Sequence, residues 1–513
     1  MRRRFFAVRA HTTMTSPRIV PHHAEARLQM DSRPRWPMER PPAVAGPRAR
    51  EGTPRVRGTR GDRGSGGAPA PRPDRHATGW RRFAASVAIA LALGGCATTQ
   101  ELMPTPALYT GADARIPFPR TSVHAPRPTL DLLFITDRAP APSGSRVPYT
   151  AARSRSMAFG SSTVEFGDGI DWDALVSESV APRRAGVLHV KLGSTRELGR
   201  FPAIPYELDV GPGGAHRAPQ VVQAFERTKR DLQEEIGKRV AAAPRKEVVL
   251  FVHGFRTSFE DAALTMGQLC HFLGREFVCA IFSWPAGARG GLLLGYDADR
   301  ESAEYAVEDL VKALRMIGAT PGVQQVHLVA HSRGSDTVAS AVSALGAEAY
   351  MRRSSPDREF RLGNIVLVAP DLDGDVAVSK IFKVFSDPDL PFGDRPDANA
   401  LIPPAPGLRL TLYASPDDKA IATAGWLFGS IARLGRLDAT MFTGDQIDAI
   451  GSLRAIDIIE VRGTTDLFGH SYLTSNPRVS ADIIALLRYG LRPNDPGRPL
   501  ERIAGSFWRL TRR

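Results

Sequence analysis

The pattern of hydrophobic and polar positions changes near residue 247. Before it, strand-like apolar runs at 130–136, 162–166 and 186–192 are separated by Pro, Gly and Ser, which predicts the antiparallel start of a sheet. The segment 219–239 then has apolar residues at helical spacing among charged ones. It predicts a helix with one buried stripe.

From residue 247 onward, short apolar runs alternate with amphipathic segments. Strands are expected at 247–252, 277–282, 326–330, 365–369, 408–413 and 456–461, and helices at 259–273, 301–317, 335–345 and 480–489. This alternation indicates an α/β fold, with a mostly parallel sheet of about eight strands and helices on both faces. Sheets of this kind carry their functional sites beyond the carboxyl ends of the strands.

One of these strand ends carries a candidate nucleophile. The run at 326–330 leads into Ala330-His331-Ser332-Arg333-Gly334, and a segment rich in small residues follows. Strand, sharp turn and helix in this order resemble the Gly-x-Ser-x-Gly elbow of α/β-hydrolases, in which a strained turn exposes a serine hydroxyl. Ala330 replaces the first glycine but is still small. An ordinary turn is the alternative, since Ser and Gly are common in turns.

A serine nucleophile needs a general base, and the base needs an acid that orients it. In α/β-hydrolases the order along the chain is Ser, then Asp or Glu, then His. His470 is the only histidine after His331, and it lies in a loop between the strand at 456–461 and the helix at 480–489. A single loop histidine can be an ordinary surface residue, but this position makes His470 the candidate base.

More than one carboxylate competes for the role of orienting acid. The strand at 408–413 runs into Asp417 and Asp418, and Asp418 is the one expected to reach the imidazole. A surface turn with a helix N-cap is the alternative reading of this pair. Asp371 and Asp373, which follow the strand at 365–369, are the other option.

The tetrahedral intermediate of such a reaction needs two N–H donors. One is expected from Arg333, directly after the candidate nucleophile, and the other from the loop His253-Gly254-Phe255-Arg256, with Phe255 the preferred donor. His253 is expected to pack or orient this loop rather than act as base, because it precedes the nucleophile in the chain. A plain turn would also explain His-Gly after a strand.

Six short motifs follow one another along the chain: Phe251-Val252-His253-Gly254-Phe255, Ser258-Phe259-Glu260-Asp261-Ala262, Phe282-Ser283-Trp284-Pro285, Gly295-Tyr296-Asp297, Ala330-His331-Ser332-Arg333-Gly334 and Val368-Ala369-Pro370-Asp371. In their order they resemble a bacterial α/β-hydrolase family of unknown function within the esterase/lipase superfamily, over about residues 130–489. The resemblance implies the α/β-hydrolase fold and serine hydrolysis, with Ser332 as nucleophile, Asp418 as acid and His470 as base. It implies no substrate. Arg333 departs from the apolar residue often found at that position, so its cation would favour acidic substrates or lie on the surface.

These residues together predict a serine hydrolase, most simply a carboxylesterase or lipase-like enzyme that forms an acyl-enzyme and needs no cofactor. Fold alone does not establish function. The alternatives are a non-catalytic envelope lipoprotein that uses the fold as a binding module, and an acyltransferase or amidase with the same triad. The expected partners are a small-molecule or lipid ester substrate and a membrane.

The formal charge of +13 lies in the first part of the chain. Residues 1–95 hold 19 of the 67 Lys and Arg and 6 of the 54 Asp and Glu, so the other 418 residues carry 48 of each sign. A strongly basic chain suggests nucleic acid or anionic membrane as a partner. The part expected to fold is formally neutral and shows no basic stripe with interleaved aromatics, so no nucleic-acid binding is expected.

The first hundred residues predict an export signal. Residues 1–79 are rich in Arg, Pro, Gly and Ala, which predicts a disordered leader or a start codon assigned too far upstream. Residues 80–96 fit a signal peptide, because two arginines precede thirteen mostly apolar residues, too few to cross a bilayer as a helix. Leu93-Gly94-Gly95-Cys96 resembles a bacterial lipobox with Cys96 as the lipidated residue; an ordinary secretory signal is the alternative. The protein is therefore expected in the bacterial envelope, lipid-anchored at the periplasmic face of the outer membrane.

The remaining chain divides into a flexible tether at 97–128, an α/β-hydrolase domain at 129–495 and a C-terminal tail at 496–513. Two insertions, 376–407 and 420–450, are expected to form a lid, with peripheral helices as the alternative. Their apolar residues include Ile381, Phe382, Phe385, Trp426, Leu427 and Phe428.

The cysteines bear on the compartment and on metal binding. Cys270 and Cys279 would pair in an oxidising compartment or remain buried free thiols. Neither has a metal-like spacing with His, so no zinc site is expected.

Overall fold

The computed structural model describes residues 99–110, 114–118, 126–288, 291–381, 407–428, 432–452, 455–463, 466 and 468–511. Every described residue belongs to the unit Gly79–Arg513. The expected leader at 1–79, the signal segment at 80–96 and its Cys96 lie outside the described residues and stay predictions.

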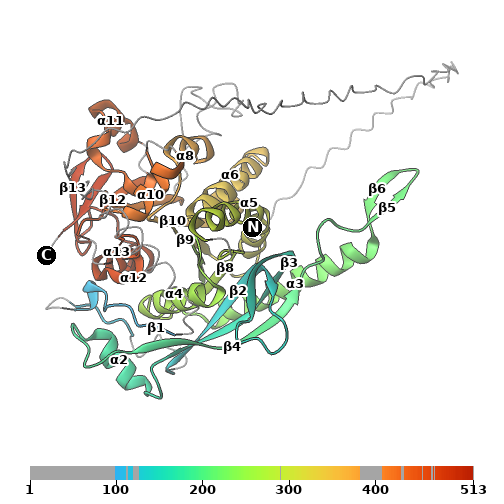
Figure 1. Ribbon diagram of the computed structural model, residues 1–513, viewed down its shortest axis with the longest axis horizontal. Helices are drawn as coiled ribbons and strands as arrows, with labels where there is room; N and C mark the ends of the chain where they lie inside the picture. The colour runs from blue at the N-terminus through green and yellow to red at the C-terminus, as the bar shows by residue number, and fades with distance from the viewer. Residues whose placement is uncertain are drawn as a thin grey trace, which may run out of the picture. The chain divides into compact units, whose positions relative to one another are not determined.

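A large sheet organises the described residues (Figure 1). Its twelve strands lie in the order β1-β4-β3-β2-β8-β7-β9-β10-β11-β12-β14-β13. Their bounds are β1 (Thr99–Glu101), β2 (Thr129–Pro140), β3 (Tyr149–Phe166), β4 (His189–Arg200), β7 (Glu247–Val252), β8 (Val278–Ser283), β9 (Gln325–His331), β10 (Leu362–Val368), β11 (Arg409–Ala414), β12 (Ile456–Glu460), β13 (Leu500–Ala504) and β14 (Phe507–Leu510). The eight neighbours from β2 to β14 run parallel. The predicted α/β class is confirmed, but twelve strands and not about eight make up the sheet in the described ranges.

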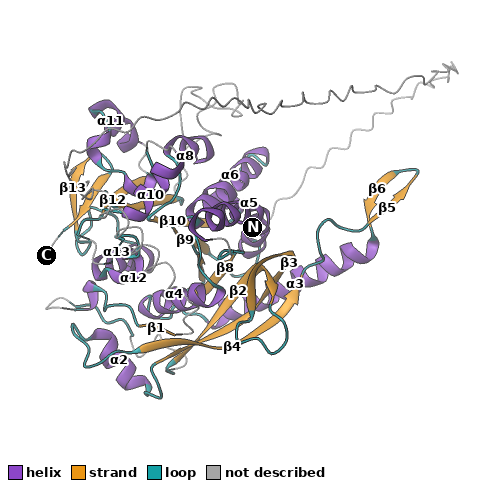
Figure 2. Cartoon of the chain, viewed as in Figure 1, coloured by secondary structure: helices purple, strands orange, loops and turns teal. Residues whose placement is uncertain are grey.

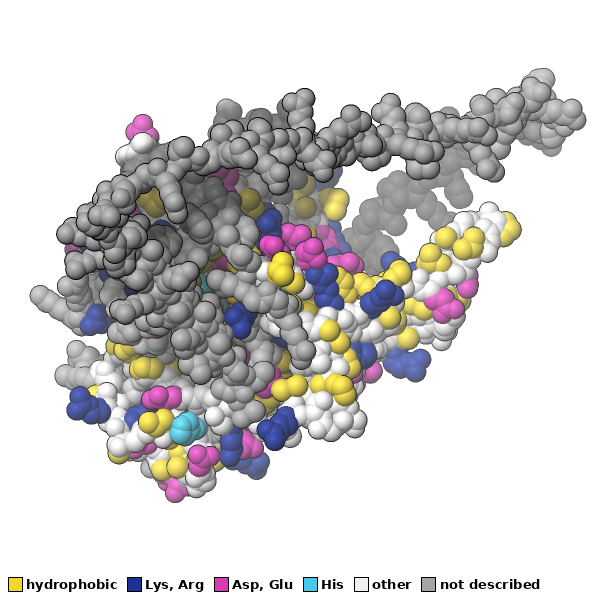
Figure 3. Space-filling view, in the orientation of Figure 1, with side chains coloured by type: hydrophobic (Ala, Val, Ile, Leu, Met, Phe, Trp, Pro, Cys, Tyr) yellow, Lys and Arg dark blue, Asp and Glu magenta, His cyan; other side chains and the backbone are white. Residues whose placement is uncertain are grey.

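Antiparallel strands extend the parallel region at both edges. β2, β3 and β4 pair antiparallel, as the strand-like runs before residue 247 predict. β3 is longer than expected because its first half pairs with the end of β2. A separate hairpin of β5 (Leu208–Gly211) and β6 (Gly214–Arg217) projects from the body (Figure 1). Its side chains are exposed, and charges of both signs are mixed with hydrophobic residues over the visible described surface (Figure 3).

Helices cover both faces of the parallel region (Figure 2). They are α2 (Trp172–Val180), α3 (Pro219–Ala242), α4 (Phe259–Phe272), α5 (Gly291–Gly318), α6 (Gly334–Met351), α7 (Pro356–Glu359), α8 (Gly374–Ile381), α10 (Lys419–Phe428), α11 (Gly444–Ser452), α12 (Tyr472–Ser475) and α13 (Pro477–Tyr489). One core contains residues of α3, α5 and α6, and the other contains residues of α4 and α13. The expected helices therefore cover both faces of the sheet.

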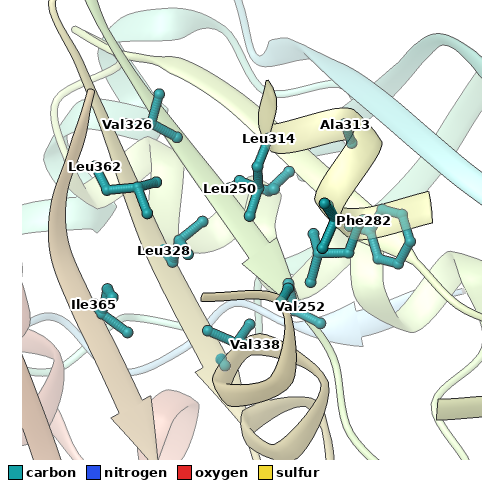
Figure 4. Close-up of a cluster of buried hydrophobic side chains, with 14 of the residues drawn as sticks. Leu250, Val252, Phe282, Ala313, Leu314, Val326, Leu328, Val338, Leu362 and Ile365 are labelled. Carbon is teal, nitrogen blue, oxygen red and sulfur yellow. The ribbon is translucent and has the colours of Figure 1, made fainter. Parts of the chain in front are cut away.

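Alternate side chains of a strand enter different cores. Leu250 and Val252 of β7 belong to the core under α5 and α6, whereas Val249 and Phe251 belong to the core under α4. Figure 4 shows part of the first core, with Val338 of α6 beside the strands. Because both faces are buried, the central strands read as continuous apolar runs instead of alternating ones.

The chain ends of the domain are structured where the sequence suggested a tether and a tail. β1 pairs with β4, and Leu102, Met103 and Tyr109 are buried. At the other end β14 pairs parallel with β12, and β13 pairs with β14, so the segment from 500 to 510 belongs to the main sheet. The tether and the tail expected from the sequence differ from the structure for one reason. These short segments are held by partners far away in the sequence, which local composition does not reveal.

The two insertions are described only in part. α8, α10 and α11 lie in them, and Trp426, Leu427 and Phe428 fall in α10. Phe382 and Phe385 lie outside the described residues, so the lid stays a prediction. None of the helices in the described ranges is both long and apolar enough to span a bilayer.

Cys270 and Cys279 form a disulfide with a Cα–Cα distance of 6.1 Å. It joins α4 to β8 in the buried core of the domain. Of the two alternatives left open by the sequence, the structure has the paired one.

Candidate active site

The turn between β9 and α6 has the geometry of a nucleophile elbow. Ser332 follows the last residue of β9 and has a φ of +52°, a left-handed conformation that a non-glycine residue rarely adopts. Its N–H donates to the Val368 carbonyl oxygen at 3.0 Å, and its own carbonyl accepts from the Asp371 N–H at 3.1 Å. These backbone bonds hold the strained turn against the end of β10.

Two glycines let the elbow approach the end of β7. A Cβ on Gly334 would lie 2.6 Å from the Val252 carbonyl oxygen and would also clash with that of His253. A Cβ on Gly254 would lie 2.8 Å from the Ser332 Cβ. The small residues of both motifs are thus required by close backbone contact between the elbow and the loop after β7.

Asp418, which is buried, and His470, which is half-buried, form a pair at the same edge of the sheet. The Nδ1 atom of His470 lies 2.7 Å from Oδ2 of Asp418, whose side chain is fully buried. The other carboxylate oxygen accepts the Ile421 N–H at 2.9 Å and so caps α10. The two readings of Asp418, a helix cap and a partner of the histidine, therefore both describe it.

The electrostatic surroundings of His470 favour its protonated form. Burial by itself lowers the pKa of the imidazole, but the hydrogen bond and the negative charge of Asp418 outweigh burial and raise the pKa above its ordinary value. The loop is held by two hydrogen bonds: the His470 N–H donates to the side-chain carboxylate of Asp466 at 2.9 Å, and the Lys419 N–H donates to the Phe468 carbonyl at 2.9 Å.

The competing carboxylates have other neighbours. Asp417 is exposed. Asp371 is buried, accepts the Tyr296 hydroxyl at 2.6 Å and forms an ion pair with Arg433. Asp373 caps α8 by accepting the N–H of the residue two positions ahead at 3.0 Å. Of these candidates it is thus Asp418 that lies against the histidine.

Arg333 occupies a different environment from either expectation. Its side chain is 8% exposed and its guanidinium pairs with Asp336 at 2.7 Å. The cation therefore neither lies on the surface nor remains unneutralised for an acidic substrate. The sequence already contained the reason for this pairing: Asp336 lies three residues after Arg333, on the same helical turn.

The main-chain N–H groups of Phe255 and Arg333 donate to no acceptor among the described residues. Both groups border the Ser332 elbow, since Phe255 follows Gly254 and Arg333 follows Ser332. Buried or half-buried N–H groups are nearly always paired, so two unused donors beside one serine are consistent with a site for an oxyanion.

His253 supports the loop after β7. Its ring stacks on Trp284 with centroids 5.1 Å apart, and the Trp284 indole N–H donates to the His253 carbonyl at 2.7 Å. Its Nε2 lies 3.2 Å from the Ser283 hydroxyl. Burial, and the nearby Arg138 charge, hold the pKa of His253 well below its usual range. A neutral, packed histidine agrees with the expected orienting role.

His331 is a site neighbour that sequence reasoning passed over. Its Nε2 donates to the His470 carbonyl at 3.1 Å, and the two rings lie 4.9 Å apart. Burial, followed by the charge of His470, lowers the pKa of His331 to about 3. The elbow is thus linked to the histidine loop through a neutral imidazole. The sequence feature that indicates a role for His331 is its position directly before Ser332.

A cavity of about 220 Å³ lies beside the elbow. Polar and apolar residues line this cavity: Phe251, His253, Gly254, Arg256, Thr257, Asp261, Thr265, His331, Ser471, Leu473 and Thr474. Within the described ranges, no group of three or more His, Cys, Asp or Glu residues has the arrangement of a metal site.

Comparisons with solved structures return esterases at low similarity. An esterase from the hyperthermophilic archaeon Pyrobaculum calidifontis is 13% identical, with 53% of this chain and 96% of that chain covered and a TM-score of 0.26. An arylesterase is 14% identical, with 52% and 93% covered and a TM-score of 0.24. Esterase B from Lactobacillus rhamnosis, inhibited by a tributyrin phosphonate, is 15% identical, with 36% and 59% covered and a TM-score of 0.19. The comparison with curated proteins found no match.

A family model matches residues 228–488, which is half of the chain and includes the elbow, Asp418 and His470. This match agrees with the family expected from the order of the sequence motifs. It also agrees with the sheet described above. The chain belongs to the family described as alpha/beta hydrolase of unknown function (DUF900).

Proposed function

We propose that the protein is a lipid-anchored serine hydrolase of the bacterial envelope, with carboxylic esters as substrates. The observation that carries the proposal is the hydrogen-bonded Asp418–His470 pair, whose histidine loop is bonded through His331 to the elbow that bears Ser332. A carboxylate on one imidazole nitrogen fixes the tautomer and leaves the other nitrogen to accept a proton.

The first half of the proposed reaction forms an acyl-enzyme. His470 Nε2 takes the proton of the Ser332 hydroxyl while Ser332 Oγ attacks the ester carbonyl carbon. The carbonyl oxygen becomes an oxyanion and accepts hydrogen bonds from the Phe255 and Arg333 N–H groups. The imidazolium then gives its proton to the alkoxy oxygen as the C–O bond breaks, and the alcohol leaves.

The second half regenerates the serine. Water attacks the acyl carbon as His470 takes one of its protons, and the oxyanion forms again. The bond between Ser332 Oγ and the acyl carbon then breaks, Ser332 Oγ recovers the proton from His470, and the carboxylic acid leaves. Asp418 stays ionised throughout and stabilises the imidazolium in both halves.

The envelope location is supported by two features of the chain. Leu93-Gly94-Gly95-Cys96 has the form of a lipobox, with Cys96 as the lipidated residue. The Cys270–Cys279 disulfide fits the same location, because disulfides persist in oxidising compartments such as the periplasm and are rare in the cytosol.

Labelling with a fluorophosphonate tests the reaction class. These probes bond covalently to an activated serine, so the purified wild-type protein should be labelled at neutral pH and Ser332→Ala should not. Equal labelling of both proteins, or of neither, would contradict the proposal and favour a non-catalytic binding role. A series of p-nitrophenyl esters of increasing acyl length, run beside peptide amides, separates ester hydrolysis from amide hydrolysis.

A further inference from the structure

Two loops at the active-site edge share one buried carboxylate. Asp299 lies on α5 and is fully buried. Its Oδ2 accepts the Arg256 N–H at 3.0 Å, both of its oxygens lie 3.0 Å from the Gly287 N, and its Oδ1 accepts the Ala288 N–H at 3.1 Å. Arg256 belongs to the loop after β7, and Gly287 to the loop after β8. The carboxylate therefore joins these loops through their amides.

A buried cation joins the same two loops through their carbonyls. Arg138 on β2 is 1% exposed. Its guanidinium donates to the Thr257 carbonyl at 2.6 Å and to the Ala286 carbonyl at 3.0 Å. It also donates to the Ser283 hydroxyl at 2.9 Å. Thr257 and Ala286 each adjoin a residue whose N–H is bound by Asp299.

Arg138 and Asp299 thus act on one pair of loops with opposite chemistry. A carboxylate can only accept hydrogen bonds and a guanidinium can only donate them. Between them they satisfy successive amides and carbonyls of two segments that have no regular secondary structure. Burial lowers the pKa of the Arg138 guanidinium to about 10, while nearby carboxylates, Asp299 among them, favour its charged form.

The loop after β7 needs such support because its backbone is strained. Arg256 has a φ of +54°, in the left-handed region, and it directly follows Phe255. The Phe255 N–H can donate to an oxyanion only while this turn is held. The N–H of the peptide bond between Phe255 and Arg256 donates to Asp299. A change at Asp299 would therefore reorient this peptide bond and the adjoining one, which carries the Phe255 N–H.

We propose that Arg138 and Asp299 are positioning residues that set the oxyanion hole by fixing the Phe255 peptide. The inference rests on the proposed serine hydrolase function. Preorganised donors matter because they stabilise the charge that develops in the transition state, and a small displacement weakens that stabilisation more than it weakens substrate binding. The expected signature is a loss of kcat with little change in KM.

Asp299→Asn tests the proposal with almost no change in volume. An amide has one accepting oxygen, and its NH2 group would face a backbone N–H, so the loops cannot both stay bound. We expect kcat for a p-nitrophenyl ester to fall on the order of 10- to 100-fold, as for a small misplacement of a catalytic group. KM should change by less than about threefold, and a trifluoromethyl ketone that forms a tetrahedral adduct should lose affinity in parallel with kcat/KM.

Asp309→Asn is the matched control. Asp309 is a buried carboxylate on the same helix, paired with Lys312 at 3.2 Å and without a bond to either loop. Its variant should keep kcat within about twofold of wild type. If Asp299→Asn does not fold, Arg138→Lys takes its place, because lysine keeps the charge but lacks the planar fork that reaches both carbonyls.

The outcomes separate the two proposals. A folded Asp299→Asn or Arg138→Lys with wild-type kcat, or with the same loss as Asp309→Asn, overturns the positioning role and leaves the hydrolase intact. A wild-type protein that neither hydrolyses esters nor reacts with fluorophosphonate overturns both. Amide hydrogen exchange of residues 255–257 and 286–288 gives a readout without catalysis, and it should accelerate in Asp299→Asn and stay unchanged in Asp309→Asn.

Discussion

Gly254 lies so close to Ser332 that a methyl group on it would be 2.8 Å from the Ser332 Cβ and 3.0 Å from the His331 carbonyl oxygen. These two neighbours belong to the elbow serine and to a strand end, and moving either of them would cost free energy. The distance between the loop after β7 and the elbow is therefore set by the absence of one side chain.

Gly254→Ala should consequently lose most ester hydrolysis and about 1–3 kcal/mol of the free energy of unfolding, the usual cost of overpacking. Gly346→Ala is the control, because Gly346 lies in α6 with open space around its Cα. Alanine there should raise the free energy of unfolding by about 0.4–1 kcal/mol and leave kcat unchanged. Urea unfolding and p-nitrophenyl ester kinetics measure both. Wild-type kcat in Gly254→Ala would show that the contact is not critical.

Asp418→Asn should lower kcat on the order of 10³- to 10⁴-fold, because the amide no longer fixes the tautomer or stabilises the imidazolium. Asp417→Asn should have no such effect, since Asp417 is exposed. The comparison uses neighbouring carboxylates, so a similar loss in both variants would argue against the assignment of Asp418.

The pH dependence follows from the raised pKa of His470. The base is active only when neutral, so kcat/KM should fall as the pH drops through a pKa above the ordinary value of about 6.5. Asp418→Asn removes the largest contributions that raise this pKa, so burial, which lowers it, is opposed only by the charges of Asp371 and Asp466. The acidic limb of the residual activity should therefore move to lower pH. A limb that stays in place, or moves to higher pH, would indicate that another group titrates.

The buried ion pair between α13 and the segment that leads into β13 should be important for stability. Arg498 and Asp482 form an ion pair in which both side chains are fully buried, and Asp482 also accepts the Tyr413 hydroxyl at 2.7 Å. Arg498→Ala leaves this carboxylate buried with less compensation and should cost about 3–5 kcal/mol of unfolding free energy. Arg498→Met combined with Asp482→Leu should recover much of the loss. Thermal unfolding of the three proteins compares them, and a single variant as stable as wild type would be the contrary result.

Cys96→Ala should release the protein from the membrane fraction. Lipidation at this cysteine is the proposed anchor, and the helices in the described ranges include none that would replace it as a membrane span. Fractionation of cells that express each form, with detection of the protein by antibody, gives the result. Unchanged membrane association would point to another anchor.

Local pattern was enough for the main architecture. The strands β7 and β12 and the helix α4 lie within a residue or two of their expected bounds, because burial on both faces of a parallel sheet demands uninterrupted apolar runs. Ser332 and His470 were recognisable for a related reason: both follow such runs, and the carboxyl ends of parallel strands meet at one edge.

Tertiary structure decided what depends on contacts between distant segments. Asp417 and Asp418 are neighbours in sequence, and only the direction of each side chain at the start of α10 separates an exposed carboxylate from the partner of His470. β1 and β14 have weak patterns of their own and are held by pairing with β4 and β12.

The positions of Arg138 and Asp299 show the same limit at the site. Neither lies near Ser332 in sequence, and their spacing from it carries no motif. They meet the loops after β7 and β8 because the sheet order places β2 and β8 side by side and α5 packs across them. The sequence by itself determined the fold class and the candidate nucleophile and base, since those follow from local runs of apolar residues and their ends. The pairing of Asp418 with His470, the neutralisation of Arg333 and the approach of Arg138 and Asp299 to the loops after β7 and β8 depend on packing across the fold, which only the folded chain brings about.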